Sequence, residues 1–376
     1  LLAYCGYSTT VAFEPLAAQE KWSWVWKALV FAAFLPLLLK TRLRIEALAL
    51  TLVLCASALI VTGGIKTALG GGGYGSLVLL INDNSGLYEG SIISCVAIAI
   101  IPLIVWLAQH GTIFKPDWKV KTYGTALTFA ALLIPVGTQA RTGLVCIAVL
   151  ALLFIRQTKR RFLYLAGAAV IGLAAIPFLP SAFSQRMETI QDYKADESAA
   201  TRVAVWKWTW EFVKEHPFGG GFDAYRINKI RYDLPVVDEN GFDTGAVERR
   251  EIVDQGRAYH SSFFEMLGEQ GFPGLIIWLL IHVGGVWRME MVARMYKKRN
   301  RADESWVAPL ATALQNAQII YLVGSLFVGI AFQPFVYMLV AMQLGLDTYL
   351  ARRRNEAAWT PIRKQRMKAK EISPAA

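Results

Sequence analysis

The stretch RAYHSSFFEMLGEQGFPG, residues 257–274, places a histidine and two serines directly before a strongly apolar run. The composition indicates the environment of that apolar run, because 55% of the residues are hydrophobic and only 18% are charged. The apolar residues gather in runs about as long as a bilayer is thick, and such runs are typical of transmembrane helices. The sequence therefore predicts an all-α polytopic membrane protein.

The apolar runs predict a bundle of about nine transmembrane helices, since a helix satisfies its own backbone hydrogen bonds in lipid. The expected spans are residues 22–39, 45–62, 87–108, 120–139, 142–155, 162–179, 263–287, 306–328 and 332–350. They divide the chain into an N-terminal bundle at 1–179, a polar segment at 180–262, C-terminal helices at 263–350 and a basic tail at 351–376. The chain opens with LLAYCGYSTT and no initiator methionine, so we expect further N-terminal spans in the full-length protein.

Lysine and arginine are concentrated in every second loop between the expected spans. These residues are Lys40, Arg42 and Arg44, then Lys115, Lys119 and Lys121, then Arg156, Lys159, Arg160 and Arg161, then Arg288, Arg294, Lys297, Lys298, Arg299 and Arg301, and the tail from Arg352 to Lys370. Basic residues favour the cytoplasmic side of a membrane, so segment 180–262 is expected on the external face. The net charge of +11 then follows mainly from topology, and a nucleic-acid partner is a poor explanation of it.

Within the external segment, residues 199–221, AATRVAVWKWTWEFVKEHPFGGG, predict a tryptophan-rich helix. Its expected apolar stripe recurs at helical spacing and consists of Val203, Trp206, Trp210 and Val213. His216, Pro217 and the glycines that follow are expected to end it. The stripe fits either a helix lying on the membrane surface or one packed on the bundle, and the pattern leaves both open.

Two arginines are candidates for binding an anion. Arg141, in QARTG, stands between two expected spans with no carboxylate nearby in the sequence, on the side of the membrane where basic residues are otherwise sparse. Its alternative role is to reach a lipid phosphate. Arg202 is expected to open the tryptophan-rich helix, where its guanidinium and the helix N–H groups would form a phosphate site. Its alternative is an ordinary exposed arginine beside Asp196 and Glu197.

His260 is the candidate general base, because it is expected at the external mouth of the bundle and a group of pKa near neutrality accepts a proton from a hydroxyl. Ser261 and Ser262 suggest a nucleophile, but no orienting carboxylate or oxyanion device can be placed beside them, so this reading carries less weight.

Tyr259, Glu265 and Glu269 are possible supporting residues around His260. Either glutamate could orient the histidine or cap the helix, and the sequence leaves both open.

The stretches TRVAVWKWTWEFVKEHPFGGGFDAYR and AYHSSFFEMLGEQGFPGLIIWLL, preceded by QARTG between two spans, resemble the O-antigen ligase/polymerase family of membrane glycosyltransferases. The shared order is an arginine after a span, an arginine before a tryptophan-containing loop helix that ends in proline and glycine, and then a histidine. The resemblance covers about residues 60–350. The family typically has about twelve spans, which again implies that N-terminal spans precede this chain.

The resemblance implies a reaction at the periplasmic face of a bacterial inner membrane. A glycan would pass from undecaprenyl diphosphate to a sugar hydroxyl of the lipid A core, with inversion and without metal or cofactor. Matched by position, Arg141 and Arg202 would hold the diphosphate and His260 would activate the hydroxyl. The implied partners are this donor, this acceptor and membrane lipid.

Three alternatives stay open. An O-antigen polymerase and a protein O-oligosaccharyltransferase use the same donor. A transporter of lipid-linked glycans would also need basic groups facing a phosphate. Charged residues are sparse within the expected spans, however, whereas transporters usually place polar sites near the bilayer midplane.

Overall fold

The computed structural model describes residues 1–70, 89–157, 197–235, 249–299 and 301–358. Its helices are α1 (Leu2–Thr10), α2 (Pro15–Leu38), α3 (Arg42–Ala68), α4 (Gly90–Ala99), α5 (Ile101–His110), α6 (Trp118–Thr138), α7 (Arg141–Gln157), α10 (Glu197–Glu215), α11 (Ser262–Arg299), α12 (Val307–Gly324) and α13 (Pro334–Ala358). Two short 3₁₀ helices, η3 (Ala224–Ile227) and η4 (Ala302–Glu304), and two strands, β1 (Lys229–Pro235) and β2 (Arg249–Gln255), complete the described elements.

Every predicted span within the described residues contains a helix, and the predicted span 162–179 lies outside them. Five of the described helical segments are long and apolar enough to cross a bilayer, namely α2, α3, α4 with α5, α6 and α11. The chain is thus a multi-pass helical membrane protein, and the total of nine spans stays a prediction.

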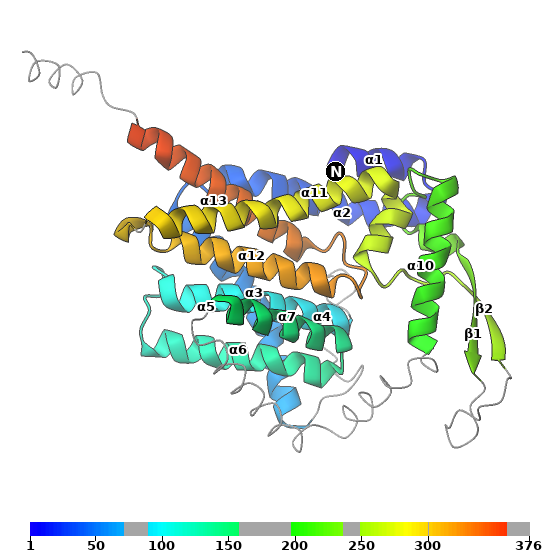
Figure 1. Cartoon of the computed structure of the whole chain (residues 1–376), viewed down its shortest axis with the longest axis horizontal. Helices are drawn as coiled ribbons and strands as arrows, with labels where there is room; N and C mark the ends of the chain where they lie inside the picture. Colours follow the sequence, from blue (N-terminus) through cyan, green and yellow to red (C-terminus); the bar gives the residue numbers. More distant parts are fainter. Residues whose placement is uncertain (71–88, 158–196, 236–248, 300, 359–376) are drawn as a thin grey trace, which may run out of the picture.

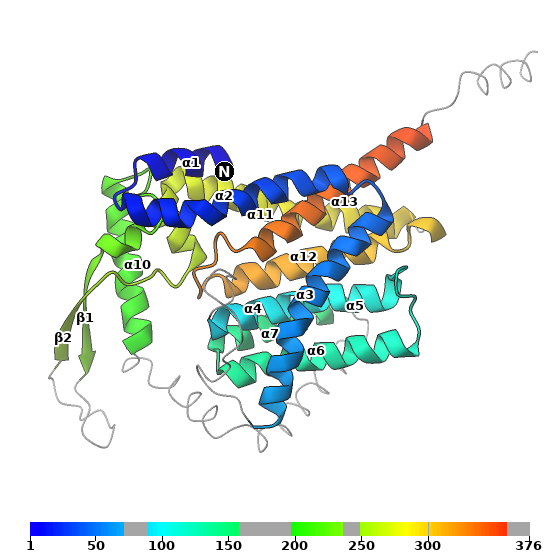
Figure 2. The ribbon, with the colours of Figure 1, turned by 180° about the vertical axis from the view of Figure 1, so that it is seen from behind.

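The basic loops gather at one end of the bundle. Arg42 donates to the carbonyl of His110 at 2.8 Å, and Arg352 donates to the carbonyl of Leu39 at 3.3 Å. These contacts join the α2–α3 corner, the end of α5 and the end of α13, while α10 and the strands lie at the opposite end (Figure 1). Figure 2 shows α3 crossing the bundle obliquely. This separation agrees with the alternation of basic loops in the sequence.

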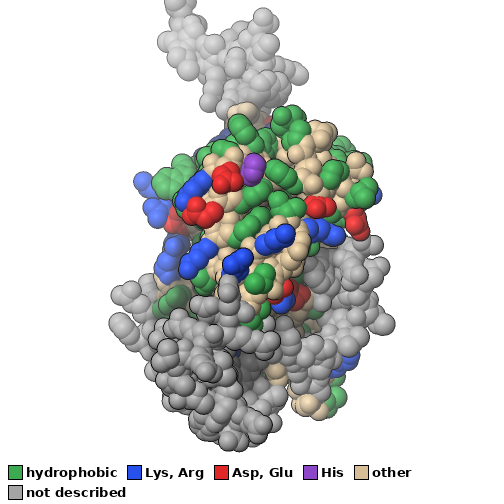
Figure 3. All heavy atoms as spheres, turned by 90° about the vertical axis from the view of Figure 1, so that its right-hand side faces the viewer, with side chains coloured by type: hydrophobic (Ala, Val, Ile, Leu, Met, Phe, Trp, Pro, Cys, Tyr) green, Lys and Arg blue, Asp and Glu red, His purple; other side chains and the backbone are tan. Residues whose placement is uncertain are grey.

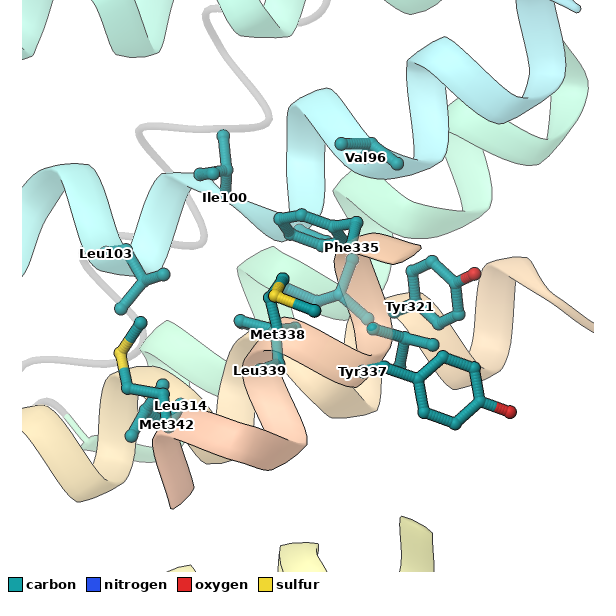
Figure 4. Packing of buried hydrophobic residues seen from close by; sticks show 14 of the residues in the cluster. Val96, Ile100, Leu103, Leu314, Tyr321, Phe335, Tyr337, Met338, Leu339 and Met342 are labelled. Atoms are coloured by element: carbon teal, nitrogen blue, oxygen red, sulfur yellow. The ribbon is translucent and has the colours of Figure 1, made fainter. Parts of the chain in front are cut away.

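Buried residues of α4, α5, α12 and α13 lie together in the core of the bundle (Figure 4). Phe335, Leu339 and Met342 of α13 are buried there and lie near Ile100 and Leu103. Because lipid tails are as apolar as these side chains, close packing rather than the hydrophobic effect holds such helices together.

The strands differ from the predicted all-α fold. β1 and β2 pair in antiparallel register, with Lys229 opposite Gln255 and Pro235 opposite Arg249. The prediction is confirmed for the bundle, and this two-stranded sheet is the exception among the described elements.

The predicted apolar stripe of α10 is only partly correct, since Val213 is buried as expected and Trp206 is half-buried. Val203 and Trp210 are exposed, and the buried face consists of Thr201, Val205, Thr209 and Val213. Trp206 stacks on Phe264 of α11 with ring centroids 5.0 Å apart. The helix therefore packs on the bundle, which was one of the two interpretations that its sequence pattern left open. It ends at Glu215, as the following proline and glycines predicted.

A backbone contact between glycines fixes the end of α10 against α11. Gly219 (φ 81°) and Gly271 (φ 63°) both have left-handed backbones, and a Cβ on Gly219 would stand 2.5 Å from the Gly271 nitrogen. Gly221 donates to the carbonyl of Glu269 at 2.9 Å, and Phe272 donates to that of Pro217 at 3.0 Å. Only glycine fits such an approach, so this run of glycines positions the functional end of α11.

Candidate functional site

A cavity of about 480 Å³ lies at the end of the bundle that carries α10. Its walls come from α2, the residue before α4, the η3 turn, the segment before α11, α11 itself and the segment before α13. The lining includes Glu20, Lys21, Trp24, Glu89, Asp223, Tyr225, Arg226, Tyr259, His260, Glu265 and Glu269. Figure 3 looks onto this end, where side chains of both charges lie among hydrophobic ones.

His260 is held at the cavity in a strained backbone conformation. Its φ of 47° is left-handed, which is uncommon for a residue other than glycine. Hydrogen bonds fix the chain on both sides of it. The carbonyl of Tyr259 accepts from the Trp206 indole at 2.8 Å, and the Ser262 N–H donates to the Ser325 carbonyl at 2.8 Å. The surrounding structure therefore fixes the backbone at His260 beside the cavity.

The surroundings of His260 favour the neutral imidazole. Burial lowers the pKa of His260, the Glu89 carboxylate acts against this, and the charges of Arg202 and Arg257 lower it further. A histidine whose pKa lies below its ordinary value is unprotonated at neutral pH, so it is able to accept a proton there.

A reaction that uses neutral His260 should reveal these neighbours in its pH profile. Activity that needs neutral His260 is expected to fall toward acid. Glu89→Gln should move this acid limb to lower pH, since the Glu89 carboxylate raises the pKa of His260. Arg257→Gln should move it to higher pH, since the guanidinium lowers that pKa. Measuring kcat/KM against pH for both variants checks this, and two shifts of the same sign would contradict it.

Arg202 lies close enough to His260 to lower its pKa, as a residue of the same site would. The prediction that Arg202 opens its helix is wrong, because α10 begins at Glu197 and Arg202 lies in the second turn. Its Nε is buried with no hydrogen-bond partner in the part of the chain that the structure describes. The cationic group available here is thus the Arg202 guanidinium, and the helix N-terminus lies one turn away.

Arg141 is the first residue of α7 and does not line the cavity. The corner before it is joined to the start of α4, where Thr138 and Ser94 are linked through their hydroxyls at 2.7 Å. Glu89, which precedes α4, lines the cavity. Arg141 therefore belongs to the same end of the bundle as His260.

Neither Glu265 nor Glu269 orients His260 through a hydrogen bond that we observe. Both bind Lys21, with its Nζ 2.8 Å from Glu265 and 2.7 Å from Glu269, and Asp223 lies 3.6 Å from the same Nζ. Sequence reasoning missed Lys21, which stands just before the expected first span. The signal was present, because two acids one helical turn apart on an apolar helix need a cation.

Of the two serines that follow His260, Ser262 is structural. Ser262 Oγ donates to the carbonyl of Val328 and accepts from the N–H of Ile330, both at 2.9 Å, and its side chain is fully buried. A hydroxyl so committed is unsuited to nucleophilic attack, which agrees with the lower weight given to that interpretation.

Asn228 is a second residue that sequence reasoning missed. Its buried side-chain amide donates to the carbonyl of Arg257 at 2.7 Å, and its oxygen accepts the Arg257 N–H at 3.0 Å. The side chain thus clamps the backbone between β2 and His260. No local sequence pattern distinguishes this asparagine from an ordinary turn residue.

Comparison with known families gives two matches. Residues 1–112 match a family of unknown function (DUF5935), and residues 126–279 match the O-antigen ligase family. No curated protein matches the chain. The second match spans Arg141, Arg202 and His260, and it supports the assignment of this chain to the O-antigen ligase/polymerase family.

Proposed function

We propose that this protein is an O-antigen ligase that transfers a glycan from undecaprenyl diphosphate to a sugar hydroxyl of a lipid A core. The observation that carries the proposal is the position of His260, which lines the cavity and has the guanidinium groups of Arg202 and Arg257 close by. A base beside cations is the arrangement that attack on a sugar diphosphate requires. The cavity would face the periplasm, since it lies at the end of the bundle away from the basic loops.

In the proposed reaction His260 accepts the proton of the acceptor hydroxyl as its oxygen attacks the anomeric carbon. The bond from that carbon to the diphosphate oxygen breaks, and undecaprenyl diphosphate leaves with the electron pair. Arg202, with Arg141 at the same end of the bundle, would stabilise the negative charge that grows on the leaving group. Attack from the face opposite the diphosphate inverts the anomeric carbon, and none of these steps calls on a metal ion.

Charge removal at Arg202 tests the leaving-group role. Arg202→Ala is expected to lower kcat for glycan transfer by about 10²–10³-fold, since a preorganised donor to the developing charge is lost. Arg202→Lys should recover only part of this, because an ammonium lacks the bidentate fork. Transfer by reconstituted protein measures both.

Lys207→Ala is the matched control, because Lys207 is an exposed cation on the same helix. Its rate should equal that of the unmodified protein. A well-folded Arg202→Ala variant with transfer within about twofold of the control would remove Arg202 from the proposed mechanism.

A further inference from the structure

The cavity is lined by more carboxylates than permanent cations, which is the opposite of what an anionic diphosphate requires. It is lined by the carboxylates of Glu20, Glu89, Asp223, Glu265 and Glu269, against the permanent cations Lys21 and Arg226. We call the part formed by Glu20, Asp223, Glu265 and Glu269 the acidic wall. These residues come from α2, the residue before η3, and α11, whereas Arg202 approaches His260 from α10. The arginine proposed to bind the diphosphate and the carboxylates of the acidic wall therefore come from different elements.

The ion pairs inside the acidic wall do not balance it. Lys21 is shared among Glu265, Glu269 and Asp223. Arg226 reaches Asp223 only at 3.7 Å and is half exposed. Buried carboxylate in excess of its cations is unfavourable unless a proton or a further cation joins it. A ligand that brings positive charge would supply that cation.

Two buried polar atoms at the cavity lack partners among the described residues. One is Oε2 of Glu269, whose side chain is 0% exposed, and the other is the hydroxyl of Tyr259, which is 2% exposed as a residue. Burial and the nearby Glu269 carboxylate raise the pKa of Tyr259, so the phenol stays protonated. Native proteins rarely leave such groups unsatisfied. While it is ionised, the carboxylate accepts hydrogen bonds only, which favours a ligand that donates N–H or O–H groups.

Aromatic rings also line the cavity, beside the acidic wall. Trp24, which is 40% exposed, and Tyr225 line the same cavity. An accessible tryptophan face attracts a ligand cation more strongly than other aromatic rings do.

We propose that the acidic wall is the acceptor subsite, and that it selects a sugar carrying a protonated amine near the attacking hydroxyl. The inference rests on the proposed function and names its acceptor class. A phosphorylated acceptor would meet repulsion from the same carboxylates, so it should be a poor substrate.

Matched acceptors test the proposal in reconstituted protein supplied with an undecaprenyl-diphosphate glycan. We would compare octyl β-glucosaminide, its N-acetyl form and its 6-phosphate. The amine is expected to exceed the N-acetyl form by about tenfold or more in kcat/KM, because a charge-assisted contact is lost on acetylation. The difference should appear mainly in KM, and the 6-phosphate should be the poorest of the three.

Glu20→Gln provides the site-specific test, because Glu20 is exposed and its loss should not disturb folding. It should lower kcat/KM for the amine acceptor. The ratio of kcat/KM for the amine to kcat/KM for the N-acetyl form should therefore become smaller. Glu14→Gln, at the start of α2 and outside the cavity lining, is the matched control and should leave the ratio unchanged.

Equal use of the amine and N-acetyl acceptors, or a ratio that Glu20→Gln leaves unchanged, would overturn this inference while leaving glycan transfer established. Absence of product and of released undecaprenyl diphosphate with every acceptor would instead contradict the proposed function itself.

Discussion

Replacing His260 with alanine is expected to lower glycan transfer by about 10²–10⁴-fold, the usual contribution of a positioned general base. The loss should appear in kcat, because the proton of the acceptor hydroxyl then has no acceptor in the cavity. Binding of the diphosphate donor should persist, since the arginines that would hold it are unchanged. Initial rates and donor binding, measured on the same reconstituted samples, separate the two effects.

Two variants control this experiment. His260→Gln keeps a polar side chain but cannot take up the proton, so it should be as inactive as alanine. His110→Ala removes a histidine at the end of α5, on the far side of the bundle, and should keep full activity. Near-normal transfer by His260→Ala in a folded sample would show that His260 is not the base.

Lys21→Met is expected to destabilise the protein by about 3–5 kcal/mol, the usual effect of removing one partner from a buried ion pair. The Lys21 side chain is 13% exposed and those of Glu265 and Glu269 are 8% and 0% exposed. Without the ammonium, three carboxylates would face each other in a confined space. Denaturant or thermal unfolding in detergent measures the change in the free energy of unfolding.

Lys27→Met is the matched control, because Lys27 is exposed on the same helix and its side chain lies over Trp26. Its effect should be within about 0.5 kcal/mol of zero. Adding Glu269→Gln to Lys21→Met should restore part of the lost stability, since one charge of the repelling set is removed. Equal stability of Lys21→Met and Lys27→Met would refute the assigned role of the buried cluster.

Local patterns in the sequence predicted the helices well. Apolar runs located every described span, and Pro217 with its glycines marked the end of α10. These features depend on neighbours along the chain, which a sequence displays directly. The face of α10 depends instead on what the helix packs against, so Val203 was expected to be buried and Val205 was not.

The candidate site was only partly visible in the sequence. His260 could be chosen because a histidine at the edge of an apolar run is unusual. Lys21 could not, because its contact with Glu265 joins residues 244 positions apart. Pairing across such a distance follows from the tertiary fold, which brings Lys21 of α2 to Glu265 and Glu269 of α11, and no periodicity encodes it. The role of Asn228 was equally hidden, since its partner Arg257 lies beyond the end of β2, 29 positions along the chain.

The most direct test of the central claim is transfer by the purified protein in liposomes that contain a defined undecaprenyl-diphosphate glycan and a lipid A-core acceptor. We predict that undecaprenyl diphosphate is released in equal amount to glycosylated acceptor, and that the anomeric carbon in the product has the configuration opposite to that in the donor. Excess chelator should leave the rate unchanged, and His260→Ala should form no product above background. Glycan that lengthens on the carrier with none on lipid A, or release that continues unchanged in His260→Ala, would contradict the account.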